Sequence, residues 1–450
     1  MSRHQLRPKG TTMGTFGRGH RLLVAIALIS LSAQAAAGPV AAAAPPESGI
    51  VCSTSATATF DLVTRAGSVS LPDGNQITMW TYGLATGGFQ LPGPTLCVNQ
   101  GDTVTINLNN SLPEAVSIVF PGQSGVTAGG VPVAPQFDGV SGDLVSLVQS
   151  APTSGSITYS FVAGQPGTYL YESGTDPVKQ VQMGLFGALV VRSSTAGTAY
   201  GSAASAYNTN TEYVLLMSEV DPDLHQAVER GTSYDPAAYH VRYWMLNGRS
   251  FPDTIAPNGA NWLPAQPYSS FIHMQPKSAS NPLPALVRYI NVSTRAHPFH
   301  PHGNHGRVIA RDGRLLAAGP TDDLSYEKFL VLVGAGQTWD VLYDWTNIEN
   351  WTPETPTDAG NPIPVTVPNQ QDLTFKGNAT WYAGSPYLGY QDELPSGVTS
   401  YNQCGEYYQM WHSHALNEAA NYEAGFGGMM TLQRIDPPGG VSIDPPGIPC

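Results

Sequence analysis

The stretch on which the fold prediction depends is GSITYSFVAGQPGTYLYESG, residues 155–174. Within residues 155–163, apolar or aromatic side chains alternate with small polar ones, and this period of two is typical of a half-buried β-strand. The GQPG turn at residues 164–167 leads into a second short run, GTYLY, at residues 167–171. Because glycine and proline favour turns between strands, we expect the two runs to form a β-hairpin.

Alternating runs of this kind recur along most of the chain, as in DTVTINLN at residues 102–109. The 48 glycines and 38 prolines disfavour long helices, and residues 221–231 are the best candidate for a short one. Further strand-like runs occupy residues 187–192, 212–218, 241–246, 286–292, 308–310, 338–343, 406–411 and 429–434. The sequence therefore predicts an all-β protein.

A faint internal repeat indicates two copies of one β-sandwich fold. An aromatic strand, a Gly-rich bend and an apolar strand follow one another near the end of each half of the chain. A stretch rich in proline and glycine with little periodicity, residues 351–404, is expected to be a long insertion. The expected organisation is a first domain at residues 51–195, a linker at 196–210, a second domain at 211–437 that contains the insertion, and a tail at 438–450.

Residues 1–44 have the order of a secretory signal peptide. Basic residues with no acidic neighbour precede an apolar run at residues 22–31, and the small residues that follow suit cleavage after about Ala37 or Ala44. The apolar run is shorter than the roughly 20 residues of a membrane span, and no later segment approaches that length. We expect an exported protein, periplasmic or extracellular, without a membrane span; either Met1 or Met13 could start the chain.

Charge and cysteine content narrow the partners further. With 20 Lys and Arg against 33 Asp and Glu, the net charge of −13 and the lack of a basic run argue against nucleic acid as a partner. Four cysteines remain after the leader, and an even number in an exported chain predicts two disulfides. Three pairings are open; proximity along the chain favours Cys52–Cys97 and Cys404–Cys450.

Histidines gather in two short strings. AHPFHPHGNH, residues 296–305, holds four of them, and His412 and His414 flank Ser413. In an extended strand, alternate side chains point to the same face about 7 Å apart, so each His-x-His presents two imidazoles together. Two such pairs on neighbouring strands would form a site of four imidazoles that suits copper or zinc. His305, at the end of the first string, is expected to be a loop residue or a donor that orients a ligand.

Here the chain resembles the multicopper oxidases of the laccase type. The string that begins at His297, HPFHPHG, resembles their HPxHxHG motif, and WHSH at residues 411–414, followed by GFGGMM, resembles their final copper-binding segment. LPGPTL at residues 91–96 with GDTV at 101–104 resembles their opening strands, and GTYLYESG with QMGLFG at residues 182–187 resembles the end of their first domain. The resemblance implies two cupredoxin-like Greek-key β-sandwich domains.

The departures from the family pattern concern the type 1 copper first. In the family, this copper is held by two histidines and a cysteine and passes electrons to a trinuclear cluster that reduces dioxygen. Ser413 stands where the family has the cysteine, Glu418 where it has the later histidine, and the axial ligand falls at about Glu423. Because a serine hydroxyl cannot replace the soft thiolate, no type 1 copper is expected. His297 remains from that set and is expected to pair with Glu418 instead.

The trinuclear cluster is reduced as well. Residues 119–121 and 172–174 occupy the positions of the first domain's histidine pairs, and of these residues Glu172 alone could still bind a metal. The resemblance carries over one type 2 ligand, His300, and three type 3 ligands, His302, His412 and His414. We expect these four to hold one copper per chain at the domain interface, with His297 and Glu172 as further candidate ligands and zinc as the alternative metal. Ordinary laccase-type oxidation is expected to be absent.

Three functions are compatible with this pattern. The leading one is binding, buffering or presentation of copper by an exported protein, with the copper ion as partner and a protein partner or an oligomer in addition. The second is a copper-dependent oxidoreductase that acts without a type 1 copper and receives electrons directly from a small reductant. The third is a metal-free scaffold that binds a partner, since a fold can outlast the sites it once carried.

Overall fold

A computed structural model describes residues 47–303, 305–319, 322–346, 407–422 and 424–436. These residues belong to a compact unit that spans residues 45–450. The expected signal peptide, the insertion at residues 351–404, the tail, Glu423, Cys404 and Cys450 lie outside the described residues. No described helix is long and apolar enough to cross a membrane.

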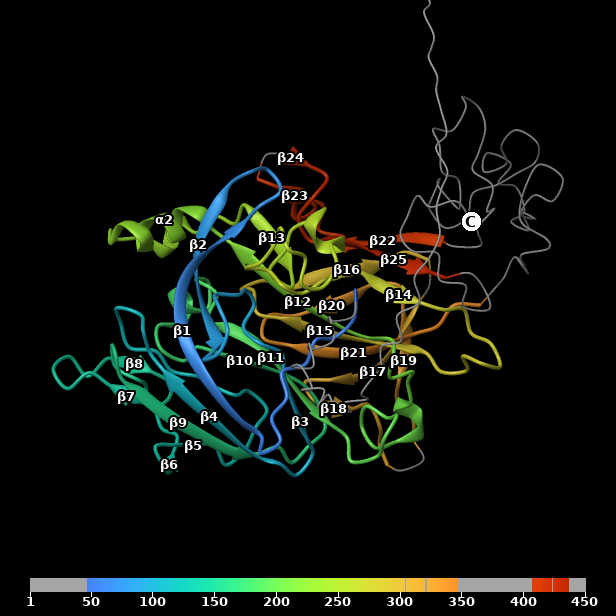
Figure 1. Ribbon diagram of the computed structural model, residues 1–450, viewed down its shortest axis with the longest axis horizontal. Coiled ribbons are helices and arrows are strands. Elements are labelled where there is room, and N and C mark those ends of the chain that lie inside the picture. The colour runs from blue at the N-terminus through green and yellow to red at the C-terminus, as the bar shows by residue number, and fades with distance from the viewer. Residues whose placement is uncertain (1–46, 304, 320–321, 347–406, 423, 437–450) are drawn as a thin grey trace, which may run out of the picture. The chain divides into compact units, whose positions relative to one another are not determined.

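The first half of the described chain folds as two facing β-sheets (Figure 1). One has the strand order β2-β1-β4-β9-β5-β6 and the other the order β10-β11-β3. The elements are β1 (Thr59–Ser70), β2 (Gln76–Leu84), β3 (Leu96–Asn99), β4 (Thr103–Asn109), β5 (Thr127–Ala128), β6 (Val131–Pro132), the pair β7 (Gln136–Phe137) and β8 (Leu144–Ser146), β9 (Ser156–Val162), β10 (Gly167–Glu172), α1 (Pro177–Gln180), β11 (Phe186–Arg192) and the 3₁₀ turn η1 (Ala203–Ser205).

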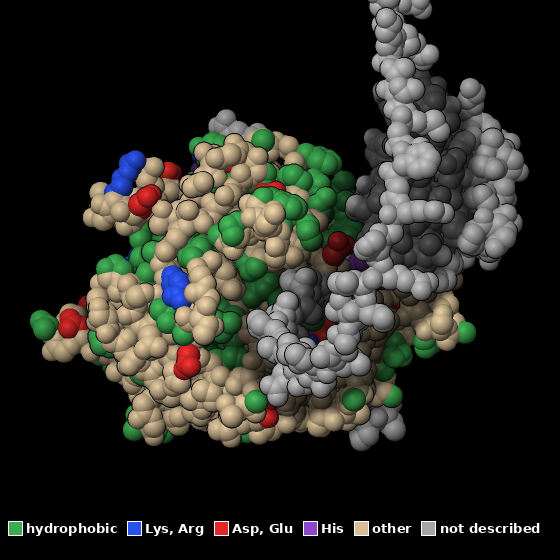
Figure 2. All heavy atoms as spheres, in the orientation of Figure 1, with side chains coloured by type: hydrophobic (Ala, Val, Ile, Leu, Met, Phe, Trp, Pro, Cys, Tyr) green, Lys and Arg blue, Asp and Glu red, His purple; other side chains and the backbone are tan. Residues whose placement is uncertain are grey.

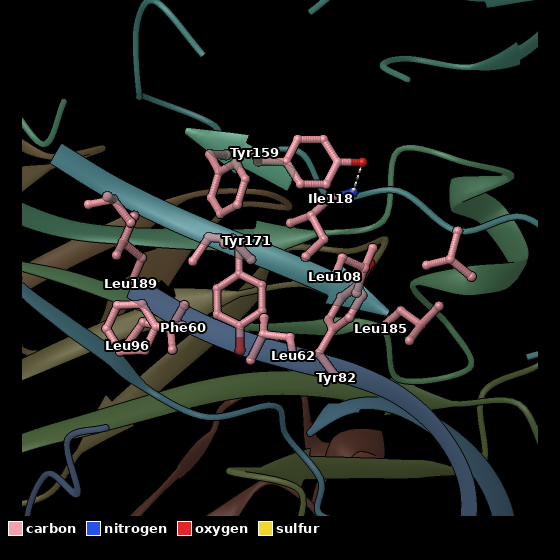
Figure 3. Close-up of a cluster of buried hydrophobic side chains, with 14 of the residues drawn as sticks. Phe60, Leu62, Tyr82, Leu96, Leu108, Ile118, Tyr159, Tyr171, Leu185 and Leu189 are labelled. Atoms are coloured by element: carbon pink, nitrogen blue, oxygen red, sulfur yellow. Dashed lines mark hydrogen bonds between the residues drawn. The ribbon is translucent and has the colours of Figure 1, made fainter. Parts of the chain in front are cut away.

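The core of this half lies between its two sheets. Leu62 from β1 and Leu108 from β4 pack with Tyr171 from β10 and Leu189 from β11, and all four are buried (Figure 3). The alternation in β4 explains why: Val104, Ile106 and Leu108 face this core while the residues between them stay near the surface.

The predicted hairpin at residues 155–174 is wrong, although both of its strands exist. β9 pairs with β4 and β5 in the larger sheet, whereas β10 pairs with β11 in the smaller one. The GQPG segment therefore carries the chain from one sheet to the other. Glycine and proline favour a change of direction but do not specify which strand becomes the hydrogen-bonding neighbour.

The second half repeats the arrangement with larger sheets. One sheet has the order β18-β17-β21-β15-β12-β13-β23-β24, with β19 paired to β17, and the other has the order β14-β25-β22-β16-β20. Its elements are β12 (Glu212–Val220), α2 (Pro222–Arg230), η2 (Pro236–Ala238), β13 (Tyr243–Leu246), η3 (Asp253–Ile255), β14 (Ile272–Met274), β15 (Ala285–Asn291), β16 (His297–Pro301), β17 (Gly306–Arg311), β18 (Arg314–Leu315), β19 (Tyr326–Lys328), β20 (Val331–Val333), β21 (Thr338–Tyr343), β22 (Tyr407–Ser413), η6 (Leu416–Glu418), β23 (Ala420–Asn421), β24 (Ala424–Gly425) and β25 (Met430–Ile435).

The sandwich prediction is confirmed in this half too. Leu215 and Tyr289 from the larger sheet pack with Phe299 and Trp411 from the smaller one. The short helix expected at residues 221–231 is α2, which begins after the capping side chain of Asp221. The protein is therefore an all-β sandwich protein with few helices.

The two halves share a buried boundary. Met79 and Phe186 from the first half pack with Leu216 and Ile290 from the second. In the described chain, every β-ladder stays within one half, which is compatible with the predicted division into residues 51–195 and 211–437, and that division stays a prediction.

A buried charge network also crosses this boundary. The guanidinium of Arg288 donates to Glu212 at 2.6 Å and to the hydroxyl of Thr168 at 2.8 Å. That hydroxyl donates in turn to Asp340 at 2.5 Å. Arg288, Glu212 and Asp340 are all buried, so each charge has a partner in place of water.

One disulfide ties the start of the described chain to the first sandwich. Cys52 is bonded to Cys97 on β3, with 5.5 Å between the two Cα atoms, as the proximity argument predicted. Charged side chains are sparse on the face drawn in Figure 2, in keeping with a chain of which 12% is charged.

Candidate metal centre

The two histidine strings lie on neighbouring antiparallel strands, β16 and β22 (Figure 1). In the register of this pair, His300 is opposite His412 and Phe299 is opposite Ser413. Successive side chains of a strand point to opposite faces, and His297, Phe299 and Pro301 are accordingly buried, whereas Pro298 and His300 are only partly covered. One face of the strand pair therefore joins the core, and the other carries His300.

Four imidazoles meet on that second face and form what we call the imidazole cluster: His300, His302, His412 and His414. The ring of His300 lies 4.7 Å from that of His302, 5.8 Å from that of His412 and 5.3 Å from that of His414, measured between centroids. The sequence prediction that the two His-x-His pairs converge therefore describes the geometry of the structure.

Glycine allows the first string to turn directly after His302. Gly303 has a φ of +91°, and a Cβ there would lie 2.8 Å from the side chain of Gln409. A residue with a side chain would be strained in this conformation and would also press on β22. The glycine of the HPHG string thus lets the chain leave the strand while His302 stays beside His412.

Backbone carbonyls fix the protonation of two rings. Nδ1 of His300 lies 2.7 Å from the carbonyl oxygen of Phe329, and Nδ1 of His412 lies 2.8 Å from that of Ser413. Because a carbonyl can only accept, each Nδ1 must donate, and a neutral ring then keeps the lone pair of its Nε2. This is the pattern in which histidines commonly bind metals through Nε2.

The closest approach in the cluster joins two Nε2 atoms. Nε2 of His302 and Nε2 of His412 are 3.2 Å apart. Two nitrogens bound to one ion at about 2.0 Å with a tetrahedral angle would be separated by about 3.3 Å. In the absence of a metal, the same distance fits a hydrogen bond from His302 to the lone pair of His412.

The cluster favours neutral imidazoles. Burial and the neighbouring His300, His412 and His414 lower the pKa of His302 to about 4. Burial also lowers the pKa of His412. Neutral rings are the form that binds a metal ion, so at pH 7 no proton has to leave these two before a metal can bind.

The cluster does not amount to a preformed cage. Among the described residues, no three His, Cys, Asp or Glu side chains are arranged to hold a metal ion as they stand. His302 and His412 already face each other, whereas the exposed His414 and the half-exposed His300 would have to turn their rings toward the same point. The donor set nevertheless fits copper or zinc, since imidazole nitrogen suits both.

The buried face of the same strands holds a different group, the buried polar triad of His297, Ser413 and Glu418. Nδ1 of His297 donates to Oε2 of Glu418 at 2.8 Å, and the hydroxyl of Ser413 donates to the same oxygen. The expected pairing of His297 with Glu418 is confirmed. Because His297 points to the opposite face from His300, the structure does not bring it to the imidazole cluster.

A close backbone contact places Glu418 in the triad. η6 ends at Glu418, whose carbonyl oxygen accepts from the amide of Met429 at 2.9 Å. A Cβ on Gly428 would lie only 2.2 Å from that oxygen, so the approach requires glycine. The glycines of GFGGMM therefore hold the carboxylate where the family has a copper ligand.

Glu172 is not part of the imidazole cluster either. It lines a pocket with Phe186, Glu219 and Ser293 that contains no histidine, and burial raises its pKa to about 7. Its backbone pairs with that of Val119, so the two positions where the family has first-domain histidine pairs do lie side by side. His305 is exposed, with its ring 6.3 Å from that of Phe329.

The expected location of the site at the domain interface is not seen in the described part of the chain. The hydrogen-bond and ring partners described for the four imidazoles lie within residues 298–414. The reason is the parity of β16 and β22: the face that carries the imidazoles is opposite the face that packs into the core. Sequence reasoning also missed the carbonyl of Phe329, because a backbone acceptor has no sequence signature.

Comparison with known proteins agrees with the fold and the resemblance. Residues 66–196 match the family model described as multicopper oxidase. Laccase-24 of Oryza sativa subsp. japonica is 23% identical over 65% of this chain and 45% of its own length. The iron transport multicopper oxidase fetC of Epichloe festucae is 41% identical over 22% of this chain and 14% of its own length. The chain thus spans less than half the length of these curated relatives.

Solved structures show the same architecture. The blue copper oxidase from Nitrosomonas europaea superimposes with a TM-score of 0.54 at 18% identity, covering 86% of this chain and 88% of that one. The multicopper oxidase mgLAC gives a TM-score of 0.53 at 18% identity, covering 86% and 87%. The fold is that of the cupredoxin-like sandwich proteins. The chain is a member of the multicopper oxidase family, which implies copper as its metal.

Proposed function

We propose that this protein binds about one copper ion per chain through the imidazole cluster and buffers or presents it, with export as part of that role. The observation that carries the proposal is the pair of anchored rings, His300 and His412, each of which donates Nδ1–H to a carbonyl. Anchoring orients the rings and leaves both Nε2 lone pairs available at pH 7. The Nε2 of His302 lies 3.2 Å from that of His412, which is a suitable spacing for shared coordination.

The residues that replace the family's other ligands support binding rather than laccase-type oxidation. Without the thiolate at Ser413, the chain has no soft ligand next to His412 and His414 to relay electrons from a type 1 copper. Four imidazoles suffice for one copper ion and not for a trinuclear cluster. Bound copper would supply a Lewis-acidic, redox-active centre, and the chain's own contribution is to hold neutral imidazoles around it.

A second candidate function is an oxidoreductase that receives electrons directly from a small reductant. Exposure favours it, because His414 is exposed and His300 is half-exposed, so small molecules can reach the cluster. A third outcome, a metal-free scaffold, would leave the four imidazoles with hydrogen bonds alone. Metal content and then turnover separate the three.

The first experiment measures metal content by mass spectrometry after copper loading and dialysis. The wild-type chain is expected to retain about one copper ion, and His300→Ala/His302→Ala to retain at least about tenfold less, because two of the four ligands are gone. His305→Ala is the matched control, since it removes an exposed imidazole of the same string and should leave the copper content unchanged.

Each other outcome rejects part of the proposal. Equal retention by the double variant would place the metal elsewhere, and no retention by the wild-type chain would favour the metal-free scaffold. Loading with zinc in parallel identifies the preferred metal, because tighter retention of zinc would overturn copper as the ligand. Oxidation of a small reductant by the copper-loaded wild type, lost in the double variant, would establish the second candidate instead.

A further inference from the structure

A pocket of about 270 Å³ lies between the two halves of the chain, away from the imidazole cluster. We call it the carboxylate pocket, because Glu172 on β10 and Glu219 on β12 both line it. Val181, Phe186 and Val292 contribute apolar walls, and the exposed Val178 lies at its edge. Its volume approaches the lower limit of small-molecule sites, about 300 Å³.

The polar side of the pocket is built by two parallel strands that end together. In the β12–β15 pair, Met217 is opposite Asn291, so Glu219 on β12 lies near Thr294, just after β15 ends. The two are joined directly: Oε1 of Glu219 accepts from the hydroxyl of Thr294 at 2.5 Å and from its amide at 3.0 Å. The hydroxyl of Tyr239 donates to the same oxygen at 2.8 Å. Glu219 is thus held rigidly by one of its two carboxylate oxygens.

The other carboxylate oxygen has no partner. Oε2 of Glu219 is buried and forms no hydrogen bond with any described residue, and the same is true of the hydroxyl oxygens of Ser218 and Ser293. All three residues line the pocket and are less than one-tenth exposed. Buried polar atoms without partners are costly, so a ligand that satisfies them gains affinity.

The charge of the pocket determines the sign of that ligand. Two carboxyl groups line it, and its described lining includes no lysine, arginine or histidine. The nearby Lys179 is already paired with Glu114 at 2.8 Å and with Asp176 at 3.1 Å. A cation is therefore favoured inside the pocket, and an anion would meet uncompensated negative charge.

We propose that the carboxylate pocket binds a small primary amine with an apolar body. An ammonium group has three N–H donors, and three buried acceptors without partners line the pocket: Oε2 of Glu219 and the hydroxyl oxygens of Ser218 and Ser293. The apolar body would contact Phe186, Val181 and Val292. A bare metal ion would leave these walls uncovered. The proposal is independent of copper binding, because no residue of the imidazole cluster lines the pocket.

The test titrates the protein with 2-phenylethylammonium chloride by calorimetry at pH 7 in the presence of EDTA, which prevents the amine from binding through copper. The expected Kd is about 1 mM or tighter for a ligand of this size. The neutral isostere 2-phenylethanol has the same shape without the charge and is expected to bind at least about tenfold more weakly. Equal binding of the two would overturn the role of the carboxylates.

Two variants locate the binding. Glu219→Gln keeps an oxygen for Thr294 and Tyr239 but removes the charge, and it should weaken amine binding by about tenfold or more. Val178→Arg places a cation at the mouth from an exposed position, where folding is not affected, and should abolish binding. Glu327→Gln, on the exposed side of β19, is the control and should bind as the wild type does.

The outcomes separate this proposal from the copper site. If amine binding is absent from the wild type, or unchanged in both Glu219→Gln and Val178→Arg, the proposal is overturned. Sodium and calcium chloride are titrated alongside, and a response to either ion that matches the response to the amine would indicate a simple cation site instead. Copper retention by Glu219→Gln should equal that of the wild type, so failure of one proposal does not imply failure of the other.

Discussion

The two faces of the β16–β22 strand pair carry histidines in opposite situations. On the core side, His297 is fully buried, and its Nδ1 donates to the carboxylate of Glu418. On the other side, His300 is half-exposed, and its Nδ1 donates to a backbone carbonyl, which leaves the opposite nitrogen available. The residues are three positions apart, yet strand parity sorts them into a hydrogen-bonded group of the core and a candidate ligand.

The difference shows how a metal site can be lost on one face and kept on the other. A buried ligand that loses its metal must find a protein partner, and the side chains of Glu418 and Ser413 now provide one for His297. Partly exposed imidazoles face no such demand, because water can satisfy their free nitrogens. The buried face has therefore become structural, and the other face has retained the arrangement of a binding site.

The comparison predicts its largest effect on the buried face. His297→Ala removes the donor to Glu418, which is only 4% exposed, and leaves a buried carboxylate without its imidazole partner. We expect the free energy of unfolding to fall by about 3 to 5 kcal/mol, the usual cost of breaking a buried pair. Urea unfolding followed by tryptophan fluorescence measures this change.

A control variant distinguishes the polar interaction from simple loss of volume. Replacing the whole buried polar triad by apolar residues, as His297→Leu/Ser413→Ala/Glu418→Leu, leaves no polar group without a partner. It should be less destabilised than His297→Ala, because an apolar replacement of a complete buried pair is often nearly neutral. A loss of less than about 1 kcal/mol for His297→Ala would show that the triad contributes little to stability and would remove the contrast between the two faces.

Much of the fold followed from alternation in the sequence. DTVTINLN predicted the strand that is β4, and residues 338–343 predicted β21 with the same bounds. The partner of a strand was harder to predict, as β9 and β10 show. Both have clear strand patterns, but neither pattern states whether the connecting turn stays within a sheet or crosses to the other, since this depends on packing across the whole core.

A third histidine sharpens the comparison, because His225 is buried like His297 but has no carboxylate partner. Its Nδ1 donates to the carbonyl of Thr78 at 2.7 Å, and burial lowers its pKa from 6.5 to about 4. The unfolded chain therefore takes up a proton between pH 6.5 and pH 4 that the folded chain does not. The stability that this neutral imidazole provides is complete above pH 6.5 and decreases as the pH falls toward 4, by up to about 3 kcal/mol.

The measurement is the free energy of unfolding at a series of pH values from 7 to 4. His225→Asn can still donate to the carbonyl of Thr78 but does not titrate, so its stability should fall less steeply over this range than that of the wild type. Parallel curves for the two proteins would mean that His225 is not the acid-sensitive group and that burial without a carboxylate does not distinguish it from His297.

For the candidate site, strand parity predicted which imidazoles share a face, and the distances among His300, His302 and His412 agree with it. The position of the cluster relative to the first half of the chain was not predictable, because it depends on which face of the smaller sheet joins the core. The carboxylate pocket was equally hidden. Its acceptors come from Ser218, Glu219 and Ser293, which meet only because β12 and β15 end side by side.

The smallest effect is expected on the exposed side, in the metal-free protein. Removing two partly exposed rings leaves no buried group without a partner, so His300→Ala/His302→Ala should change the free energy of unfolding by about 1 kcal/mol or less. Copper then provides the contrast. At a free concentration of 100 times Kd, a ligand bound only by the folded state adds about 2.7 kcal/mol, so copper should stabilise the wild type and not the variant. Equal stabilisation of both would mean that the ion binds outside the cluster, and a large loss in the metal-free variant would mean that this face, like the one that holds His297, has become part of the structural core.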